Sequence, residues 1–462
     1  MINYLGKTLD TLASSYWFLP GVLAACAFAL AVFLTQSPDV HALELADGLW
    51  WVRLFEPNGA RVLMGTIAGS MITVAGVTFS ITISAIVHAT SQFGPRLLIN
   101  FMQDRGNQLT LGTFIATFLY CLVVLSSITG DPGPDGNGVF FIPHLAVLVG
   151  VGFAVASTIV LIYFVHHVPS SIHSSHVISS VGKQLVLNIR ASYLTPEQAD
   201  GASGEQLAGE AIAHDIGDLR TIRSPHTGYV QLLDADALCR IARELDGLVV
   251  LNAKPGDFVS FGDYLAWVQT SRELDDDTVE RICACFLCGD RRTDIQDILF
   301  QANELVEIAT RALSPGINDP FTAMLCIDWL GSAFAAIAGR HCSRYQLHDD
   351  RGDLRLLVPA VSASAFILET LGKLIPYVAR DRNAALHMQA MLGRLMINAH
   401  CTAMLSELHV EATALCERAS AYLDGDDVSE MRMRAGVLNR ITDDHDTNAA
   451  VCREHHWLGG SN

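Results

Sequence analysis

The stretch VLMGTIAGSMITVAGVTFSITISAIVHA, residues Val62 to Ala89, contains no Asp, Glu, Lys or Arg. A helix crosses the hydrocarbon core of a bilayer with ~20 apolar residues, and it satisfies its own backbone hydrogen bonds there. A helix buried in a soluble domain usually keeps a polar face. These residues therefore predict a membrane-spanning helix.

Three further uncharged apolar runs lie within the first 167 residues: Tyr16 to Leu34, Leu111 to Ile128 and Leu145 to Val165. The first run is long for a signal peptide and is not followed by an evident cleavage site, so we expect it to be retained. The fold class expected is an α-helical integral membrane protein with four transmembrane helices in residues 1–167.

The rest of the chain is acidic and carries most of the net charge of −18. Residues 168–462 hold 25 basic and 40 acidic side chains. Such a domain is repelled by phosphate backbones, so nucleic acid is not an expected partner. The expected partner is the lipid bilayer, because the chain carries the apolar spans described above. One more apolar run, Phe321 to Ala338, contains Asp328 and follows a strong helix cap, so we expect a soluble core helix rather than a fifth span.

Turn and strand signals divide this acidic part of the chain into a soluble α+β domain. Residues 168–220 read as a juxtamembrane helix and a linker. Residues 221–271 predict a small β module resembling a barrel-sandwich domain without a carrier lysine. Residues 272–442 predict a helical bundle, with a hairpin at Tyr345 to Val358, and residues 443–462 a flexible tail.

Basic residues near the spans predict the orientation of the chain. Lys7, Arg96, Arg105, Lys183 and Arg190 flank the ends expected to face the cytoplasm, whereas the two outer loops sum to a charge of −4. Short cytoplasmic loops retain Lys and Arg. Both termini and the α+β domain are therefore expected to be cytoplasmic.

The second span carries one narrow polar face. Its hydroxyl-rich stripe recurs at spacings of three and four residues and consists of Thr66, Ser70, Thr73, Val77, Ser80 and Ser84. Three glycines run beside it, namely Gly65, Gly69 and Gly76. The stripe either lines a water-filled path or joins helices in a packed bundle, and the glycines suit close helix packing. Four uncharged helices do not readily enclose a path, so a pore would need a homo-oligomer, and the acidic outer loops would favour inorganic cations.

Two polar phrases in the helical part supply further candidates. Thr293 to Gln296 has the form of a capping box, and Asp319 followed by Pro320 is typical of a helix start. These roles leave a set of polar side chains that either serve the fold or converge on a ligand or a neighbouring subunit. The set is Arg292, Gln296, Asp297, Asn318 and Asp319.

Metal, cofactor and enzyme signatures are weak. Cys283, Cys285 and Cys288 have no partner pair at zinc-finger spacing, and His173 and His176 have no nearby carboxylate or thiol, so we expect no metal and no cofactor. The chain has no P-loop, nucleophile elbow or zincin motif, so no enzymatic activity is expected.

Four segments together resemble a bacterial family of predicted membrane proteins, domain of unknown function 2254. They are Ser91-Gln-Phe-Gly-Pro-Arg96, the run from Gly112 to Tyr120, Arg292-Thr-x-x-Gln-Asp297 and the phrase from Ser314 to Ala323. The likeness extends from Tyr16 to at least Ala399. It implies a multi-pass protein of the inner membrane and supplies no catalytic residues.

An oligomeric channel is the first expectation, and a membrane-tethered sensor or scaffold is the alternative.

Overall fold

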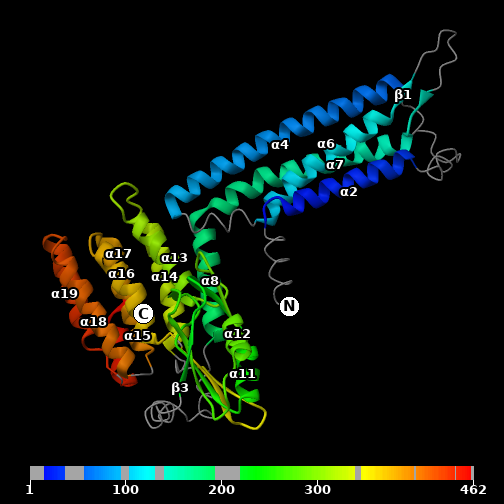
Figure 1. Cartoon of the computed structure of the whole chain (residues 1–462). Coiled ribbons are helices and arrows are strands. Elements are labelled where there is room, and N and C mark those ends of the chain that lie inside the picture. Colours follow the sequence, from blue (N-terminus) through cyan, green and yellow to red (C-terminus); the bar gives the residue numbers. More distant parts are fainter. Residues whose placement is uncertain are drawn as a thin grey trace, which may run out of the picture. The chain divides into compact units, whose positions relative to one another are not determined.

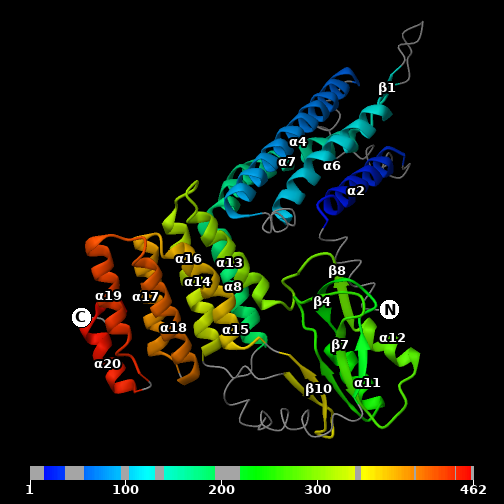
Figure 2. The same ribbon diagram turned by 60° about the vertical axis from the view of Figure 1, so that its left-hand side comes forward.

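The computed structural model describes residues 15–36, 57–94, 104–130, 140–192, 219–338, 345–359, 361–399, 402–442 and 444–458. The chain is mostly helical and forms two compact units, residues 1–176 and 177–462. Figures 1 and 2 show the long helices of the first unit and the sheets and shorter helices of the second. Each unit is described by itself below.

Unit 1 consists chiefly of four long helices. They are α2 (Phe18–Gln36), α4 (Pro57–Phe93), α6 (Arg105–Ser127) and α7 (His144–Ile172), joined in part by the short pair β1 (Thr129–Gly130) and β2 (Phe140–Phe141). All four are long and apolar enough to cross a membrane, as the sequence predicted. However, α4 has 37 residues and measures about 55 Å at ~1.5 Å per residue, which exceeds a hydrocarbon core of about 30 Å.

Helix α6 is the central helix of unit 1 and packs against α2, α4 and α7. Its side chains Phe114, Tyr120 and Val124 are completely buried. The Tyr120 hydroxyl donates a 2.8 Å hydrogen bond to the Ala146 carbonyl, and the Thr117 and Ser157 hydroxyls lie 2.9 Å apart. The interior of this bundle is therefore filled with packed side chains.

The juxtamembrane helix predicted after residue 168 is present as α8 (Ser174–Ser192), which begins just before the boundary between the units. Within unit 2 it packs closely on a later helix, α14 (Pro320–Ala338). A Cβ at Gly182 would lie 2.3 Å from Cδ2 of Trp329, so only glycine allows this approach. The predicted linker lies mostly outside the described residues.

Unit 2 contains two sheets. The first has the order β3-β7-β5-β10-β9, in which only β5 and β10 are parallel, and the second has the order β6-β4-β8. The strands are β3 (Leu219–Arg223), β4 (Gly228–Leu233), β5 (Leu248–Leu251), β6 (Phe258–Val259), β7 (Tyr264–Gln269), β8 (Phe286–Gly289), β9 (Tyr345–His348) and β10 (Leu354–Val358). Helices α11 (Ala235–Glu244) and α12 (Asp276–Ala284) complete this part.

The sheets extend beyond residues 221–271, the predicted limits of the β module. Strands β8, β9 and β10 come from the region predicted to be a helical bundle. β9 and β10 form the predicted hairpin, but β10 also pairs with β5, about a hundred residues earlier in the chain. This long-range pairing, which leaves no local pattern in the sequence, places the hairpin in the β module.

The remaining helices of unit 2 form a bundle (Figure 2). They are α13 (Ile298–Ala312), α14, α15 (Ala363–Ile367), the π-helical turn η4 (Leu368–Gly372), α16 (Lys373–Val378), α17 (Arg382–Ile397), α18 (Thr402–Ala419), α19 (Gly425–Leu438), α20 (His445–Glu454) and the 3₁₀ turn η5 (His456–Leu458). The last two differ from the predicted flexible tail. Leu458 is 3% exposed and packs against Gly393, since apolar burial holds this segment in place.

Helix α14 is a fifth helix that is long and apolar enough to cross a membrane. It packs against α13 and α17, and half of its most apolar window is buried within the protein. On its exposed side, Asp328 lies 2.7 Å from Nε2 of His387 and 3.7 Å from the Arg394 guanidinium. By length and composition alone, the described chain therefore offers five candidate spans.

Candidate functional site

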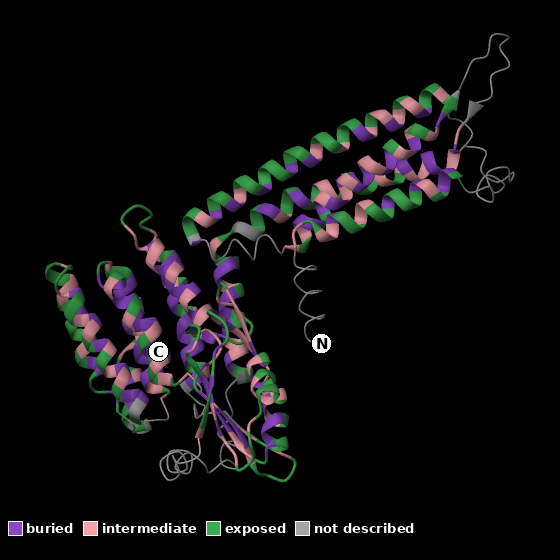
Figure 3. Ribbon diagram, viewed as in Figure 1, coloured by how far each residue is buried: buried purple, intermediate pink, exposed green. Residues whose placement is uncertain are grey.

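The hydroxyl stripe of α4 lies on the face of the helix that its own bundle leaves uncovered. All six stripe residues are exposed, namely Thr66, Ser70, Thr73, Val77, Ser80 and Ser84. Figure 3 shows that exposed residues recur along the whole length of this helix. The buried residues of α4 are Ala60, Met64, Ala68, Ala75, Thr78, Thr82, Ile86 and Ala89. At ~100° per residue, the centre of the stripe lies about 160° around the helix axis from the centre of this buried face. The stripe therefore points away from α6 and α7.

The stripe hydroxyls differ in their hydrogen bonding. Thr66 donates to the Val62 carbonyl at 2.7 Å, and Thr73 donates to the Gly69 carbonyl at 2.8 Å. Ser70, Ser80 and Ser84 have no hydrogen-bond partner among the described residues. Backbone bonding thus explains the two threonines and leaves the three serines available to water or to another chain.

The three glycines beside the stripe do not pack helices within unit 1. A Cβ placed at Gly65, Gly69 or Gly76 would meet no atom of the described residues within 4 Å. Close helix approach uses other glycines instead: a Cβ at Gly112 would lie 2.7 Å from Leu23, and one at Gly150 would lie 2.9 Å from Met64. The sequence did not distinguish glycines that contact a neighbouring helix from glycines that do not, because the residue type is the same in both cases.

A polar cluster that the sequence did not single out joins the ends of α6 and α7. Asp104 caps α6 by accepting from the Gly106 N–H at 2.8 Å, and its other oxygen lies 2.7 Å from Nε2 of His167. The His167 ring stacks on Tyr163 at a centroid distance of 5.0 Å. A capping signal at Asp104 was present in the sequence, but its pairing with His167 depends on the fold.

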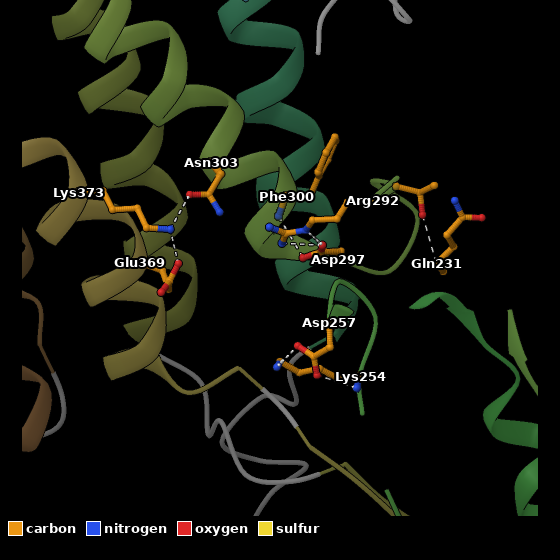
Figure 4. Close-up of polar contacts among 10 residues, drawn as sticks. Gln231, Lys254, Asp257, Arg292, Asp297, Phe300, Asn303, Glu369 and Lys373 are labelled. Atoms are coloured by element: carbon orange, nitrogen blue, oxygen red, sulfur yellow. Dashed lines mark hydrogen bonds and ion pairs between the residues drawn. The ribbon is translucent and has the colours of Figure 1, made fainter. Parts of the chain in front are cut away.

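The half-buried Arg292 and the buried Asp297 form an ion pair at the start of α13 (Figure 4). Arg292 Nε donates to Asp297 Oδ2 at 2.7 Å, while Asp297 Oδ1 accepts from the Phe300 N–H at 3.0 Å. Burial raises the pKa of Asp297, although the Arg292 guanidinium opposes this shift. Gly256, with φ of 94°, approaches so closely that a Cβ there would lie 2.2 Å from Asp297 Oδ2. The turn before β6 therefore packs directly against the Asp297 carboxylate.

The other predicted residues of unit 2 also have structural roles and do not converge. Gln296 accepts from the Leu233 N–H at 2.9 Å and donates to the Leu233 carbonyl at 3.2 Å, which continues the edge of β4. Asp319 caps α14, as predicted, because it accepts from the Thr322 N–H at 3.1 Å. Asn318 precedes it with φ of 51°. The 15 residues of α13 separate this loop from Asp297 by about 22 Å at ~1.5 Å per residue.

The predicted capping box at Thr293 to Gln296 is not the start of α13. The Thr293 hydroxyl donates to the Gln231 carbonyl at 3.1 Å, and the helix begins at Ile298 with Asp297 as its N-cap. Gln296 is bonded to β4, so it does not reach back to the Thr293 backbone. A competing sheet-edge contact therefore displaced the local capping pattern.

Unit 2 also contains a polar cavity of about 470 Å³ that the sequence did not reveal. It is lined by Arg243, Asp246, Arg272, Asp349, Asp350, Arg351 and Arg355. The residues come from the end of α11, the segment after β7 and the β9–β10 hairpin. Because these segments are distant in the sequence, no local motif marked them, and the turn residues Asp350 to Gly352 were read only as part of a hairpin.

Among the residues that line this cavity, which is called the arginine cavity below, Arg355 is the buried one. It is 7% exposed, and its guanidinium contacts Asp349 at 2.8 Å, Asp246 at 3.0 Å and Asp353 at 3.2 Å. The hydrogen bond from Arg355, together with the Arg351 and Asp353 N–H groups, lowers the pKa of Asp349 to about 2. This carboxylate is therefore ionised at neutral pH and keeps Arg355 in place.

The cysteine and histidine candidates do not gather in the described part of the chain. Among those residues, no three His, Cys, Asp or Glu side chains are placed so that they could hold a metal ion. Cys283, Cys285 and Cys288 are free thiols, and burial raises the pKa of Cys285 to about 11. Such a thiol remains protonated and is a poor metal ligand at neutral pH.

Comparisons with known proteins identify a family. A family model described as predicted membrane protein (DUF2254) matches residues 13–394. Uncharacterized proteins of Mycobacterium bovis and Mycobacterium tuberculosis are 28% identical over 447 residues, which is 96% of this chain and 83% of theirs. No solved structure matches the chain.

Proposed function

Since the chain belongs to the DUF2254 family of predicted membrane proteins, we propose that it forms an oligomeric channel in the bacterial inner membrane. In this proposal, α4 lines the path between copies of the chain. The observation that carries it is the position of the hydroxyl stripe, which is exposed along α4 opposite the buried face.

Lipid alone is a poor environment for this stripe. A hydroxyl without a hydrogen bond in an apolar medium costs roughly 1–3 kcal/mol on mutational scales. Ser70, Ser80 and Ser84 lie on one line and have no partner among the described residues. Water in a path, or a neighbouring copy, would satisfy all three at once.

A path through a single chain is not compatible with the packing of unit 1. Met64, Phe114 and Tyr120 are completely buried in its interior, and the stripe faces outward. Several copies around a shared axis would place their stripes toward one another, as cyclic oligomers do. The open surface at Gly69 and Gly76 would let neighbouring helices approach closely.

The transported species in this proposal is a small inorganic cation. The stripe carries no charge of its own, so it would offer neutral oxygen atoms to a passing ion. The predicted outer loops sum to a charge of −4, which would concentrate cations at the outer mouth. Val77, 55% exposed in the middle of the stripe, would form an apolar ring that narrows the path.

The proposal includes four spans, with both termini and unit 2 in the cytoplasm. The contacts of the Asp328 carboxylate with His387 and Arg394 support treating α14 as a core helix of unit 2, because a membrane-exposed helix would have to bring these polar groups into lipid. The basic residues flanking the spans support the orientation.

A thiol-labelling experiment separates four spans from five. Cysteines placed at Asn137, in a predicted outer loop, and at Ser429, exposed on α19 beyond α14, are treated in intact spheroplasts with a membrane-impermeant maleimide. With four spans, N137C is labelled and S429C is labelled only after permeabilisation. If α14 crosses the membrane, S429C is labelled in intact cells. Labelling of the unsubstituted chain under the same conditions gives the background from the native cysteines.

The channel proposal is tested with the purified full chain in liposomes and planar bilayers. We expect single-channel cation currents, and a flux of potassium ions from loaded liposomes, in preparations that are monodisperse by size-exclusion chromatography. Absence of current from such protein over a wide range of voltage and membrane tension would overturn the proposal.

The alternative of a membrane-tethered sensor or scaffold gains no support from the residues first predicted for it. Asp319 is occupied in capping α14, and Arg292 and Asp297 are occupied with each other. A ligand-binding role for unit 2 would need a different surface.

A further inference from the structure

The arginine cavity of unit 2 holds more hydrogen-bond donors than its own carboxylates use. Arg355 is engaged by three aspartates. Arg243 meets Asp350 only at 3.4 Å, with both side chains more than half exposed. The Arg351 side chain has no partner among the described residues. Because each guanidinium carries five N–H donors, several donors remain free at the rim of the cavity.

The cavity is richer in arginine than the rest of the acidic chain. Its lining holds four arginines and three aspartates, and Asp353 also contacts Arg355, whereas the whole chain carries a net charge of −18. The nearby Glu244 carboxylate is paired with Arg281 at 2.6 Å. At the rim, Arg272 and Arg351 have no carboxylate partner among the described residues, so their positive charge is available to an anion.

The rim of the cavity is preorganised. Asp349 accepts from the Arg351 N–H at 2.9 Å and from the Asp353 N–H at 3.0 Å, which fixes the turn that carries Arg351. Arg272 donates to the Glu244 carbonyl at 2.6 Å, so this terminal carbonyl of α11 does not face a ligand unpaired. A ligand entering here would not have to order the hairpin, and this saves binding free energy.

We propose that this cavity binds a small hydrophilic anion through phosphoryl oxygens, with Arg243, Arg272 and Arg351 as its donors. Guanidinium groups match phosphate oxygens in a planar, two-pronged geometry. A volume of about 470 Å³ fits a small organic phosphate better than a bare ion, since ligand pockets usually measure about 300–1,000 Å³. The lining is wholly arginine and aspartate, so it offers no aromatic surface for a base and no apolar wall for an acyl chain.

The test uses the full chain in detergent micelles and inorganic pyrophosphate as the probe, measured by isothermal titration calorimetry. We expect saturable binding that is weakened at least tenfold by Arg351→Gln. This variant should keep its thermal unfolding temperature, because no described residue bonds to the Arg351 side chain. Arg240→Gln is the matched control, because Arg240 is exposed on α11 and lies outside the cavity. This substitution removes one positive charge, as Arg351→Gln does.

A second arm distinguishes a soluble ligand from the headgroup of an anionic lipid. The titration is repeated in nanodiscs of phosphatidylglycerol and of phosphatidylcholine. Weaker pyrophosphate binding in phosphatidylglycerol nanodiscs than in phosphatidylcholine nanodiscs supports a lipid headgroup as the ligand. Equal binding in the two kinds of nanodisc supports a soluble phosphate. The proposal is overturned if pyrophosphate does not bind saturably, or if Arg240→Gln weakens binding as much as Arg351→Gln. The outcome is independent of whether the protein conducts ions.

Discussion

Tryptophan at Thr73 or Ser80 is expected to lower single-channel conductance at least tenfold. In a symmetric oligomer, one substitution adds an indole from every copy at the same level of the path, so a narrow water-filled channel would be blocked. The substitution should not disturb the fold of the single chain, because both positions are exposed on the uncovered face of α4. Conductance is measured in planar bilayers with the reconstituted full chain.

The matched control for this experiment is Ile159→Trp. Ile159 is 64% exposed and lies on α7, away from the stripe and from the glycines beside it. Its tryptophan should leave conductance near that of the unsubstituted protein. If T73W and S80W assemble normally and conduct like I159W, then α4 does not line the path and the assignment of the stripe is wrong.

The four long apolar helices of unit 1 could be predicted from the sequence because apolar length is a local property. The ends of the helices could not. The residues Thr90, Ser91 and Gln92 are polar and fall outside the predicted second span, yet α4 continues to Phe93. Composition indicates where hydrocarbon can surround a helix, whereas the helix itself ends only where its backbone hydrogen bonding stops.

The face occupied by the stripe could be predicted, but not its direction. A period of 3.6 residues places Thr66, Thr73 and Ser80 together, and the structure agrees. Which side of α4 is covered depends on where α6 and α7 pack, and that is decided by contacts such as those of Met64 with Gly150. Helical periodicity alone carries no information about these neighbours.

In unit 2, helix caps could be predicted from the sequence, whereas the arginine cavity could not. Asp319 was predicted correctly as a cap, because capping involves residues within one turn of each other. The arginine cavity depends on Arg355 meeting Asp246, which β10 makes possible by pairing with β5. Contacts between such distant segments have no single-sequence signature.

Leucine at Gly69 and at Gly76 together is expected to convert the proposed oligomer into monomers in mild detergent. In the proposed channel these glycines face a neighbouring copy, and two leucine side chains would hold the helices apart. Within the described part of one chain, a Cβ at either position meets nothing within 4 Å, so the monomer should unfold at an unchanged temperature. Mass is measured by size-exclusion chromatography with light scattering, and folding by thermal unfolding of the same samples.

Two other glycines make this experiment specific. Gly152 on α7 also has open space around it, so Gly152→Leu should leave both mass and unfolding temperature unchanged. Gly150 lies against Met64, and Gly150→Leu should lower the unfolding temperature by disturbing the bundle itself. An oligomer that persists in the Gly69→Leu, Gly76→Leu variant would place the contact between copies elsewhere. The hydroxyl stripe beside these glycines would then face lipid, and the channel proposal would lose its geometric basis.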